Sequence, residues 1–163
     1  MTALIALFFA ILQSTGAKPD IYAPLKLYDG TWHVVRKDAA KPDVLVNQCA
    51  LLEQYYACAQ NVNGKPGPLI IFLPADKPGH YSVQNIMPEG RATGLSELEI
   101  EGNHWTYSNR WNDGSKTTYY RTRNTFIDKN HIHFEQSESS DGKDWKVTMT
   151  GDESRAGPGA TRR

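Results

Sequence analysis

Charge of one sign, long hydrophobic runs and cysteine are all scarce in this sequence. The chain carries 18 basic and 18 acidic residues, and the basic residues are scattered along it. Nucleic acids and anionic membranes are bound by surfaces with an excess of basic residues, so the balance argues against nucleic acid as a partner. A glycine-rich phosphate loop and the Gly-x-Ser-x-Gly motif are also missing. We therefore assign no catalytic residues and no cofactor.

The longest apolar run is Ala3 to Leu12, near the start of the chain. It is shorter than the roughly 20 residues that a membrane-spanning helix needs, and it fits the core of a signal peptide. The small residues Thr15-Gly16-Ala17 follow it, although no lysine or arginine precedes it. We expect residues 1–17 to be a signal peptide, cleaved near Ala17. The mature chain would then be secreted or periplasmic, without an integral membrane segment; the alternative is a buried N-terminal helix.

Cysteine occurs twice, at Cys49 and Cys58. In an exported chain an even number of cysteines favours a disulfide. A disulfide needs Cα atoms about 5.5 Å apart, whereas nine residues of straight strand span about 30 Å. If the two cysteines pair, the chain must reverse within residues 50–57. The alternative is two separate thiols on one long strand.

Short β-prone segments and turn signals alternate along most of the chain. Asn63-Gly64 and Asp141-Gly142 are strong hairpin signals. We count about eight to ten such segments and no convincing amphipathic helix, which predicts an all-β antiparallel barrel or sandwich. The predicted domain covers residues 18–151. Residues 152–163 have almost no apolar content, so we expect a flexible C-terminal tail.

Large aromatic residues recur on one face of two consecutive predicted strands, 104–111 and 116–126. If both faces point inward, four aromatic side chains face one another and line a cavity, as is typical of small-molecule sites. These candidate ligand-binding residues are Trp105, Tyr107, Trp111 and Tyr120. The alternative is ordinary cross-strand packing that fills the core.

A possible metal motif, His131-x-His133-x-Glu135, places three candidate metal ligands on one strand face. Residues two apart on a strand are about 6.5–7 Å apart, so neighbouring pairs can share a metal. However, Ile132 and Phe134 form the natural inward face of this segment. We therefore expect the histidines to face solvent and assign no metal.

The stretch Tyr28-Asp29-Gly30-Thr31-Trp32 resembles the Gly-x-Trp opening of lipocalins and the wider calycin group. The segment from Ser139 to Trp145 is similar to uncharacterised secreted bacterial lipocalin-like domains. The resemblance covers residues 22–151 and implies an up-and-down barrel whose lumen can hold a small ligand. It also implies structural roles for Gly30 and Trp32, with an arginine packed on the Trp32 ring; the candidates are Arg121, Arg123 and Arg155.

The hypothesis that follows is an exported, monomeric, lipocalin-like barrel that binds a small, partly apolar molecule in its lumen without catalysing a reaction. Two alternatives stay open. One is a structural or protein-interaction β module with a filled core. The other is a barrel enzyme, an isomerase or hydrolase, which would need a buried titratable group among the aromatic residues.

Overall fold

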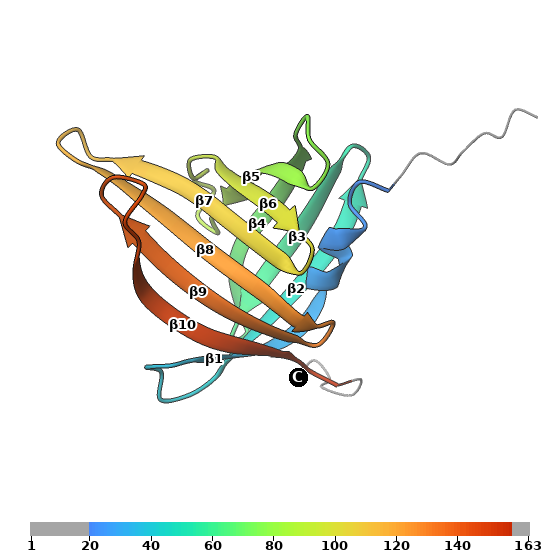
Figure 1. Cartoon of the computed structure of the whole chain (residues 1–163). Helices are drawn as coiled ribbons and strands as arrows, with labels where there is room; N and C mark the ends of the chain where they lie inside the picture. The colour runs from blue at the N-terminus through green and yellow to red at the C-terminus, as the bar shows by residue number, and fades with distance from the viewer. Residues whose placement is uncertain (1–19, 158–163) are drawn as a thin grey trace, which may run out of the picture.

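The computed structural model describes residues 20–157, and the predicted signal peptide lies outside them. The described residues form one short 3-10 helix and ten β-strands (Figure 1). Their bounds are η1 Pro24–Tyr28, β1 Gly30–Arg36, β2 Asp43–Leu52, β3 Tyr55–Val62, β4 Lys65–Pro74, β5 His80–Ile86, β6 Ser96–Glu101, β7 His104–Asn112, β8 Thr117–Asp128, β9 His131–Ser139 and β10 Lys146–Arg155.

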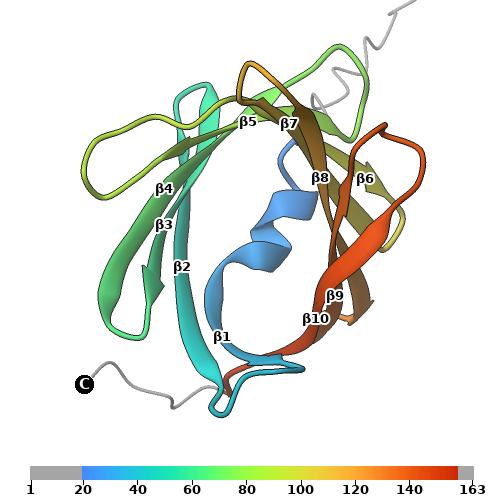
Figure 2. The same ribbon diagram turned by 90° about the vertical axis from the view of Figure 1, so that its left-hand side faces the viewer.

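The strands form a closed antiparallel barrel in which each strand pairs with the next in sequence. The first and last strands close the ring, with a register that runs from Trp32 opposite Arg155 to Arg36 opposite Gly151. Figure 2 looks into the barrel and shows η1 within the ring of strands. The predicted all-β, up-and-down antiparallel barrel is confirmed, with a strand number at the upper end of the expected range.

The hairpin predicted at Asn63-Gly64 forms as the turn chemistry requires. The two residues alone connect β3 to β4, with φ angles of 53° and 78°. Positive φ at both central residues is characteristic of the tight turn that suits strand twist, and Asn-Gly adopts it most readily. Such turns fix which side chains of the flanking strands point into the barrel.

The β2–β3 hairpin carries the disulfide. Its strands reverse at Glu53 and Gln54, and Cys49 lies directly opposite Cys58. The sulfur atoms are bonded at 2.06 Å, with the Cα atoms 4.0 Å apart. The predicted pairing is therefore confirmed, and the chain reverses within the segment that the pairing requires.

One end of the barrel is closed by η1 and the residues that follow it. Leu25 and Trp32 are completely buried there. The indole nitrogen of Trp32 donates a hydrogen bond to the backbone carbonyl of Tyr28 at 3.1 Å. Tyr22, just before η1, stacks between Tyr56 and Tyr81. These contacts make the N-terminal segment a plug, so the lumen beyond it is closed at this end.

Arg155 is the arginine that packs on Trp32, with its guanidinium 4.2 Å from the centre of the ring. The guanidinium also donates to backbone carbonyls that precede β1. Gly30 is required beside it, since its φ is +113° and a Cβ there would lie 2.7 Å from the guanidinium. Of the other candidates, Arg121 instead lies 4.2 Å above the Trp145 ring.

The final strand extends beyond the predicted domain boundary. Residues 152–155, which we expected in the flexible tail, belong to β10 and pair with both β1 and β9. The polar composition of these residues gives no sign of a strand in the sequence. They form one because barrel closure supplies backbone hydrogen-bond partners on both sides, whatever the side chains are. Glu153 is buried within this segment, and so is Gly151 directly before it. Residues 158–163, the remainder of the predicted tail, lie outside the described residues.

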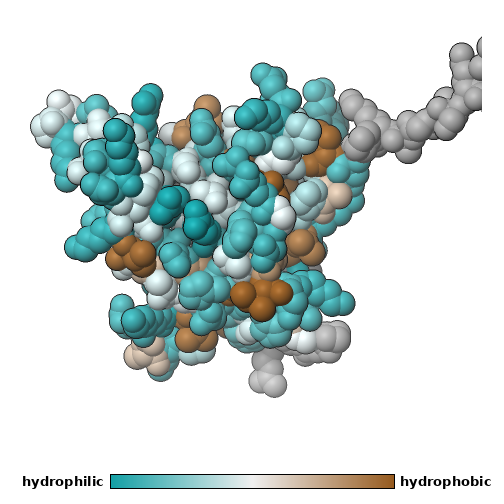
Figure 3. Space-filling model, in the orientation of Figure 1, coloured by the Kyte–Doolittle hydropathy of each residue, from teal (hydrophilic) through white to brown (hydrophobic). Residues whose placement is uncertain are grey.

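Apolar side chains on the strands are directed mainly into the barrel. The face in Figure 3 is largely hydrophilic, with apolar residues in small separate patches. Inside, the largest fully buried side chains include Trp32, Trp105, Phe72 and Leu98. Within residues 20–157, no helix has the length and apolar character needed to cross a membrane.

Candidate functional site

The barrel lumen contains a cavity of about 600 Å³, within the size range of small-molecule sites. Side chains from η1 and from all ten strands line it. The lining consists of Tyr28, Val34, Arg36, Asp43, Leu45, Gln60, Val62, Ile70, Val83, Asn85, Ser96, Tyr107, Asn109, Thr122, Asn124, Phe134, Gln136, Met149 and Glu153. The wall is therefore mixed, with apolar side chains interrupted by amides, hydroxyls and three charged groups.

Aromatic packing forms the floor of this cavity. Tyr28 lies against Trp105 with 6.0 Å between ring centres, and Trp105 lies against Phe126 at 4.7 Å. Trp105 is 1% exposed and belongs to the core below the cavity. Tyr28 therefore lies between the plugged end of the barrel and the cavity.

The wall formed by β2 and β3 carries polar groups that are satisfied within the protein. The Asn47 side chain is fully buried and donates to the backbone carbonyl of Tyr28 at 3.1 Å. Its amide oxygen accepts a hydrogen bond from the Gln60 side chain at 3.2 Å. This network holds the Gln60 amide in place at the cavity wall.

Glu153 is the most unusual group in the lumen. It is 7% exposed, and its Oε2 atom has no hydrogen-bond partner. Its neighbours across β1 and β9 are the apolar residues Val34 and Ile132. Among residues 20–157, no lysine, arginine or histidine forms an ion pair with it. Burial disfavours the ionised form and raises the pKa of the Glu153 carboxyl to about 7.

Two phenols face the same region as this carboxyl. Burial raises the pKa of Tyr107, and the negative charge of Glu153 raises it further. The pKa of Tyr28 is raised well above its usual value, first by burial and then by Glu153 and Tyr107. Both phenols therefore keep their protons at neutral pH and can act as hydrogen-bond donors in the lumen.

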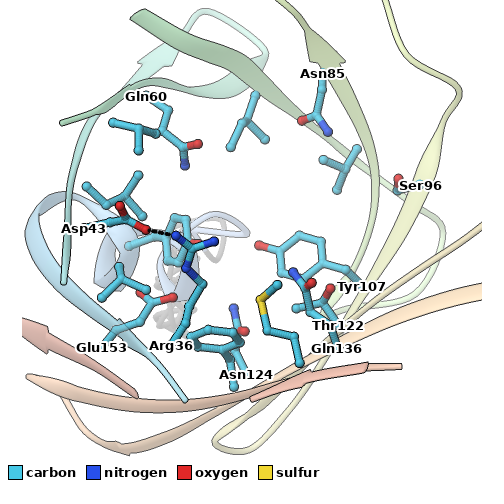
Figure 4. Close-up of a pocket in the computed structure, with 18 of the residues that line it drawn as sticks. Arg36, Asp43, Gln60, Asn85, Ser96, Tyr107, Thr122, Asn124, Gln136 and Glu153 are labelled. Atoms are coloured by element: carbon cyan, nitrogen blue, oxygen red, sulfur yellow. Dashed lines mark ion pairs between the residues drawn. The ribbon is translucent and has the colours of Figure 1, made fainter. Parts of the chain in front are cut away.

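Arg36 and Asp43 form an ion pair on the lumen wall, with 2.7 Å between Nη2 and the carboxylate oxygen. Their side chains are 42% and 25% exposed, so this pair lies where solvent reaches the barrel. The Arg36 Nε and the Asn85 Oδ1 are buried without a partner. Figure 4 shows Arg36, Glu153 and Tyr107 directed toward the cavity from different strands, with the ion pair dashed.

Of the four aromatic residues predicted to bind ligand, Tyr107 lies in the cavity wall. Trp105 lies in the core beneath it. Trp111 and Tyr120 are 65% and 43% exposed. They share the face of Tyr107, but they are placed toward the end of the β7–β8 hairpin, which extends to the upper left in Figure 1. Alternation along the strands predicted correctly that these side chains share one face. It does not predict how far along the barrel axis each residue lies, because that depends on how the other strands are placed.

The histidine motif lies on the outer face of β9. His131 contacts Asp128 at 2.9 Å and His133 contacts Asp152 at 2.8 Å, and both imidazoles are about half exposed. Across the described residues, no three or more histidine, cysteine or acidic side chains gather as a metal-binding group.

The charged lumen residues Arg36, Asp43 and Glu153 are absent from the sequence-based candidates. Strand alternation contains a weak signal for Arg36, because it follows Trp32 and Val34 at two-residue steps. The signal for Glu153 is weaker still: two-residue steps from Met149 place it on the inward face, but the residues around it are polar. Polar residues on a strand normally face solvent, and the closed register turns this one inward.

No protein-family model and no curated protein matches the chain. Among solved structures, the chain is similar to the crystal structure of Rv2717c from M. tuberculosis, with 12% sequence identity and a TM-score of 0.46. The match covers 85% of this chain and 98% of that chain.

Proposed function

We propose that this protein binds a small, partly apolar molecule in the barrel lumen and does so without catalysing a reaction. The observation that carries the proposal is the cavity of about 600 Å³, lined from every strand by a mixture of apolar and polar side chains. Binding pockets typically combine an apolar wall with a few polar groups that orient the ligand. A β module with a filled core would lack space of this volume.

Three lumen atoms without protein partners support a ligand that forms hydrogen bonds. They are the Arg36 Nε, the Asn85 Oδ1 and the Glu153 Oε2. Buried polar atoms are nearly always paired, because an unpaired one costs about 1–3 kcal/mol. A ligand that pairs with them recovers part of that cost on binding.

We propose Tyr107 as a direct ligand contact and Trp111 and Tyr120 as contacts for a ligand that reaches beyond the barrel rim. Trp105 would act indirectly, because it supports Tyr28 at the cavity floor. In this arrangement the ligand lies between the tyrosine floor and the solvent-exposed end.

Export and a lipocalin-like origin belong to the same proposal. The Cys49–Cys58 disulfide suits an oxidising compartment. The packing of Arg155 on Trp32 beside Gly30 matches the arrangement that the Gly-x-Trp resemblance implies. Intact-mass measurement of the protein recovered outside the cytoplasm would test export, and we expect a chain that begins at Lys18. Recovery of the full-length chain from the cytoplasm alone would contradict it.

The binding proposal is tested with N-phenyl-1-naphthylamine, an apolar dye whose fluorescence rises in apolar surroundings. We expect saturable binding to the native chain and weaker binding in Met149→Trp, because the larger ring occupies part of the lumen. Val147→Trp is the matched control, since Val147 lies on the same strand but is 49% exposed. Equal dye binding by both variants, or no binding by the native chain, would contradict the proposal.

A barrel enzyme is the second candidate, and Glu153 is the observation that favours it. A buried carboxyl with a pKa of about 7 can take up or release a proton near neutral pH. Among the described lining residues, no serine lies in hydrogen-bond contact with a histidine or carboxylate base. Mass spectrometry of a bound compound after prolonged incubation separates the two functions, since an enzyme converts it and a binding protein releases it unchanged.

A further inference from the structure

We infer that the lumen selects a small molecule with a protonated amine on an apolar body, and that this amine pairs with Glu153. The inference rests on the proposed function, because it names the class of ligand for the same cavity.

The charges in the lumen favour a cationic ligand. The charged lining residues are Arg36, Asp43 and Glu153. Arg36 and Asp43 neutralise each other in an ion pair. Glu153 has no such partner, so the lumen with this carboxylate ionised carries one uncompensated negative charge. A buried unpaired charge is costly, and a monovalent cation from the ligand removes that cost.

The position of Glu153 suits an ammonium group in particular. Glu153 is more than nine-tenths buried and lines the cavity, and its Oε2 atom is buried without a hydrogen-bond partner. An ammonium group brings three hydrogen-bond donors and no acceptor. The Glu153 carboxylate can accept a hydrogen bond from one of these donors. The phenol oxygens of Tyr28 and Tyr107 line the same cavity, and the Asn85 Oδ1 is a further acceptor without a partner.

The apolar body of the ligand follows from the remaining wall. Val34, Leu45, Ile70 and Val83 line the cavity together with the Phe134 ring. Aromatic rings near the carboxyl also favour a cation, because the ring face is electron-rich. An anionic ligand would instead meet Glu153 in a poorly solvated site, and the arginine in the lumen is already paired with Asp43.

The same geometry makes amine binding depend on pH. The cavity-lining residues of β3 to β9 carry amide, hydroxyl, aromatic or aliphatic side chains. No second carboxyl group therefore faces Glu153 from these strands. The titratable groups that share the cavity are the phenols of Tyr28 and Tyr107 and the Arg36–Asp43 pair. Glu153 must lose its proton to pair with an ammonium, and its pKa is about 7 without ligand. Amine affinity should therefore fall by about tenfold in total as the pH drops through 7, and it should level off above 7.

The test uses three fluorescent probes that share one apolar ring system and differ in charge. Dansyl cadaverine carries a primary ammonium, its N-acetyl derivative is neutral, and dansyl aminohexanoate carries a carboxylate. We expect the full native chain at pH 8 to bind the ammonium probe about tenfold more tightly than the neutral one. The carboxylate probe should bind most weakly. Met149→Trp should weaken binding of all three, because the larger ring occupies part of the lumen.

Glu153→Gln isolates the charge, because glutamine keeps the shape of the side chain. The variant should bind ammonium and neutral probes equally, lose the pH dependence, and keep the native affinity for the neutral probe. Asp152→Asn removes an exposed carboxylate from the neighbouring position and should bind like the native chain. Retained neutral-probe binding shows that a variant is folded.

The outcomes separate the amine inference from the proposed function. If the native chain binds ammonium and neutral probes equally and Met149→Trp weakens both, lumen binding holds and the amine inference is overturned. Tighter binding of the carboxylate probe overturns the inference in the same way. If the native chain binds none of the three probes, both proposals are overturned.

Discussion

Ionisation of Glu153 should destabilise the protein in the absence of ligand, and this can be measured without knowing the ligand. Burial raises the pKa of this carboxyl from 4.5 to about 7. The folded protein therefore binds a proton that the unfolded chain has released at any pH between these values. By linkage, the contribution of Glu153 to stability is fully present below pH 4.5 and is lost as pH rises through 7.

The magnitude follows from the two pKa values. One pKa unit corresponds to 1.36 kcal/mol, so a shift from 4.5 to about 7 is worth roughly 3 kcal/mol. Glu153→Gln removes the titration and keeps a side chain of similar size. Relative to the native chain, the variant should therefore gain about 3 kcal/mol in its free energy of unfolding between pH 4 and pH 8.

Urea unfolding of both chains across this pH range measures the effect. The difference between the chains is the relevant quantity, because the five histidines and all other titrating groups are common to both. Glu97→Gln is the control, because this carboxyl is exposed on β6 and forms no ion pair within residues 20–157, and its stability curve should run parallel to the native curve. Parallel curves for Glu153→Gln and the native chain would refute the account of a buried, unpaired carboxyl.

Three further predictions concern the scaffold and use urea unfolding at pH 7. Replacing Cys49 and Cys58 with alanine should cost about 2.7 kcal/mol, the entropy of the loop that the disulfide closes, and an unchanged midpoint would contradict this. Arg155→Gln should cost about 2 kcal/mol, because the guanidinium covers the Trp32 ring and donates to backbone carbonyls; a near-neutral effect would argue against that role. Gly151→Ala should cost more than about 1 kcal/mol, since its Cβ would lie 2.5 Å from a backbone oxygen, and native-like stability would rule out this close packing.

The barrel was predictable because its turns and strand faces are encoded locally. Asn63-Gly64 adopts the positive φ angles of a tight hairpin turn, which few other residue pairs accept. The pairing of Cys49 with Cys58 was favoured by the even number of cysteines, and the distance that a disulfide can bridge predicted the chain reversal between them. The structural role of Trp32 followed from the resemblance of residues 28–32 to the Gly-x-Trp opening, and Trp32 is completely buried at the closed end.

The composition of the cavity was less predictable, because it depends on how ten strands are placed along one axis. The alternation that put Trp111 on the face of Tyr107 is correct, yet Trp111 is 65% exposed because its strand continues past the lumen. Glu153 shows the opposite case, since it lies in a segment without apolar residues and still faces inward. Its burial comes from pairing with β1, a contact between the two ends of the chain that no local pattern contains.

A crystal structure of the protein with dansyl cadaverine at pH 8 would test the central claim most directly. The account predicts electron density for the ring system between Tyr28 and Phe134, with the ammonium within hydrogen-bond distance of Glu153. Density for the probe on the outer surface, or an empty lumen at a probe concentration that saturates the fluorescence change, would contradict it.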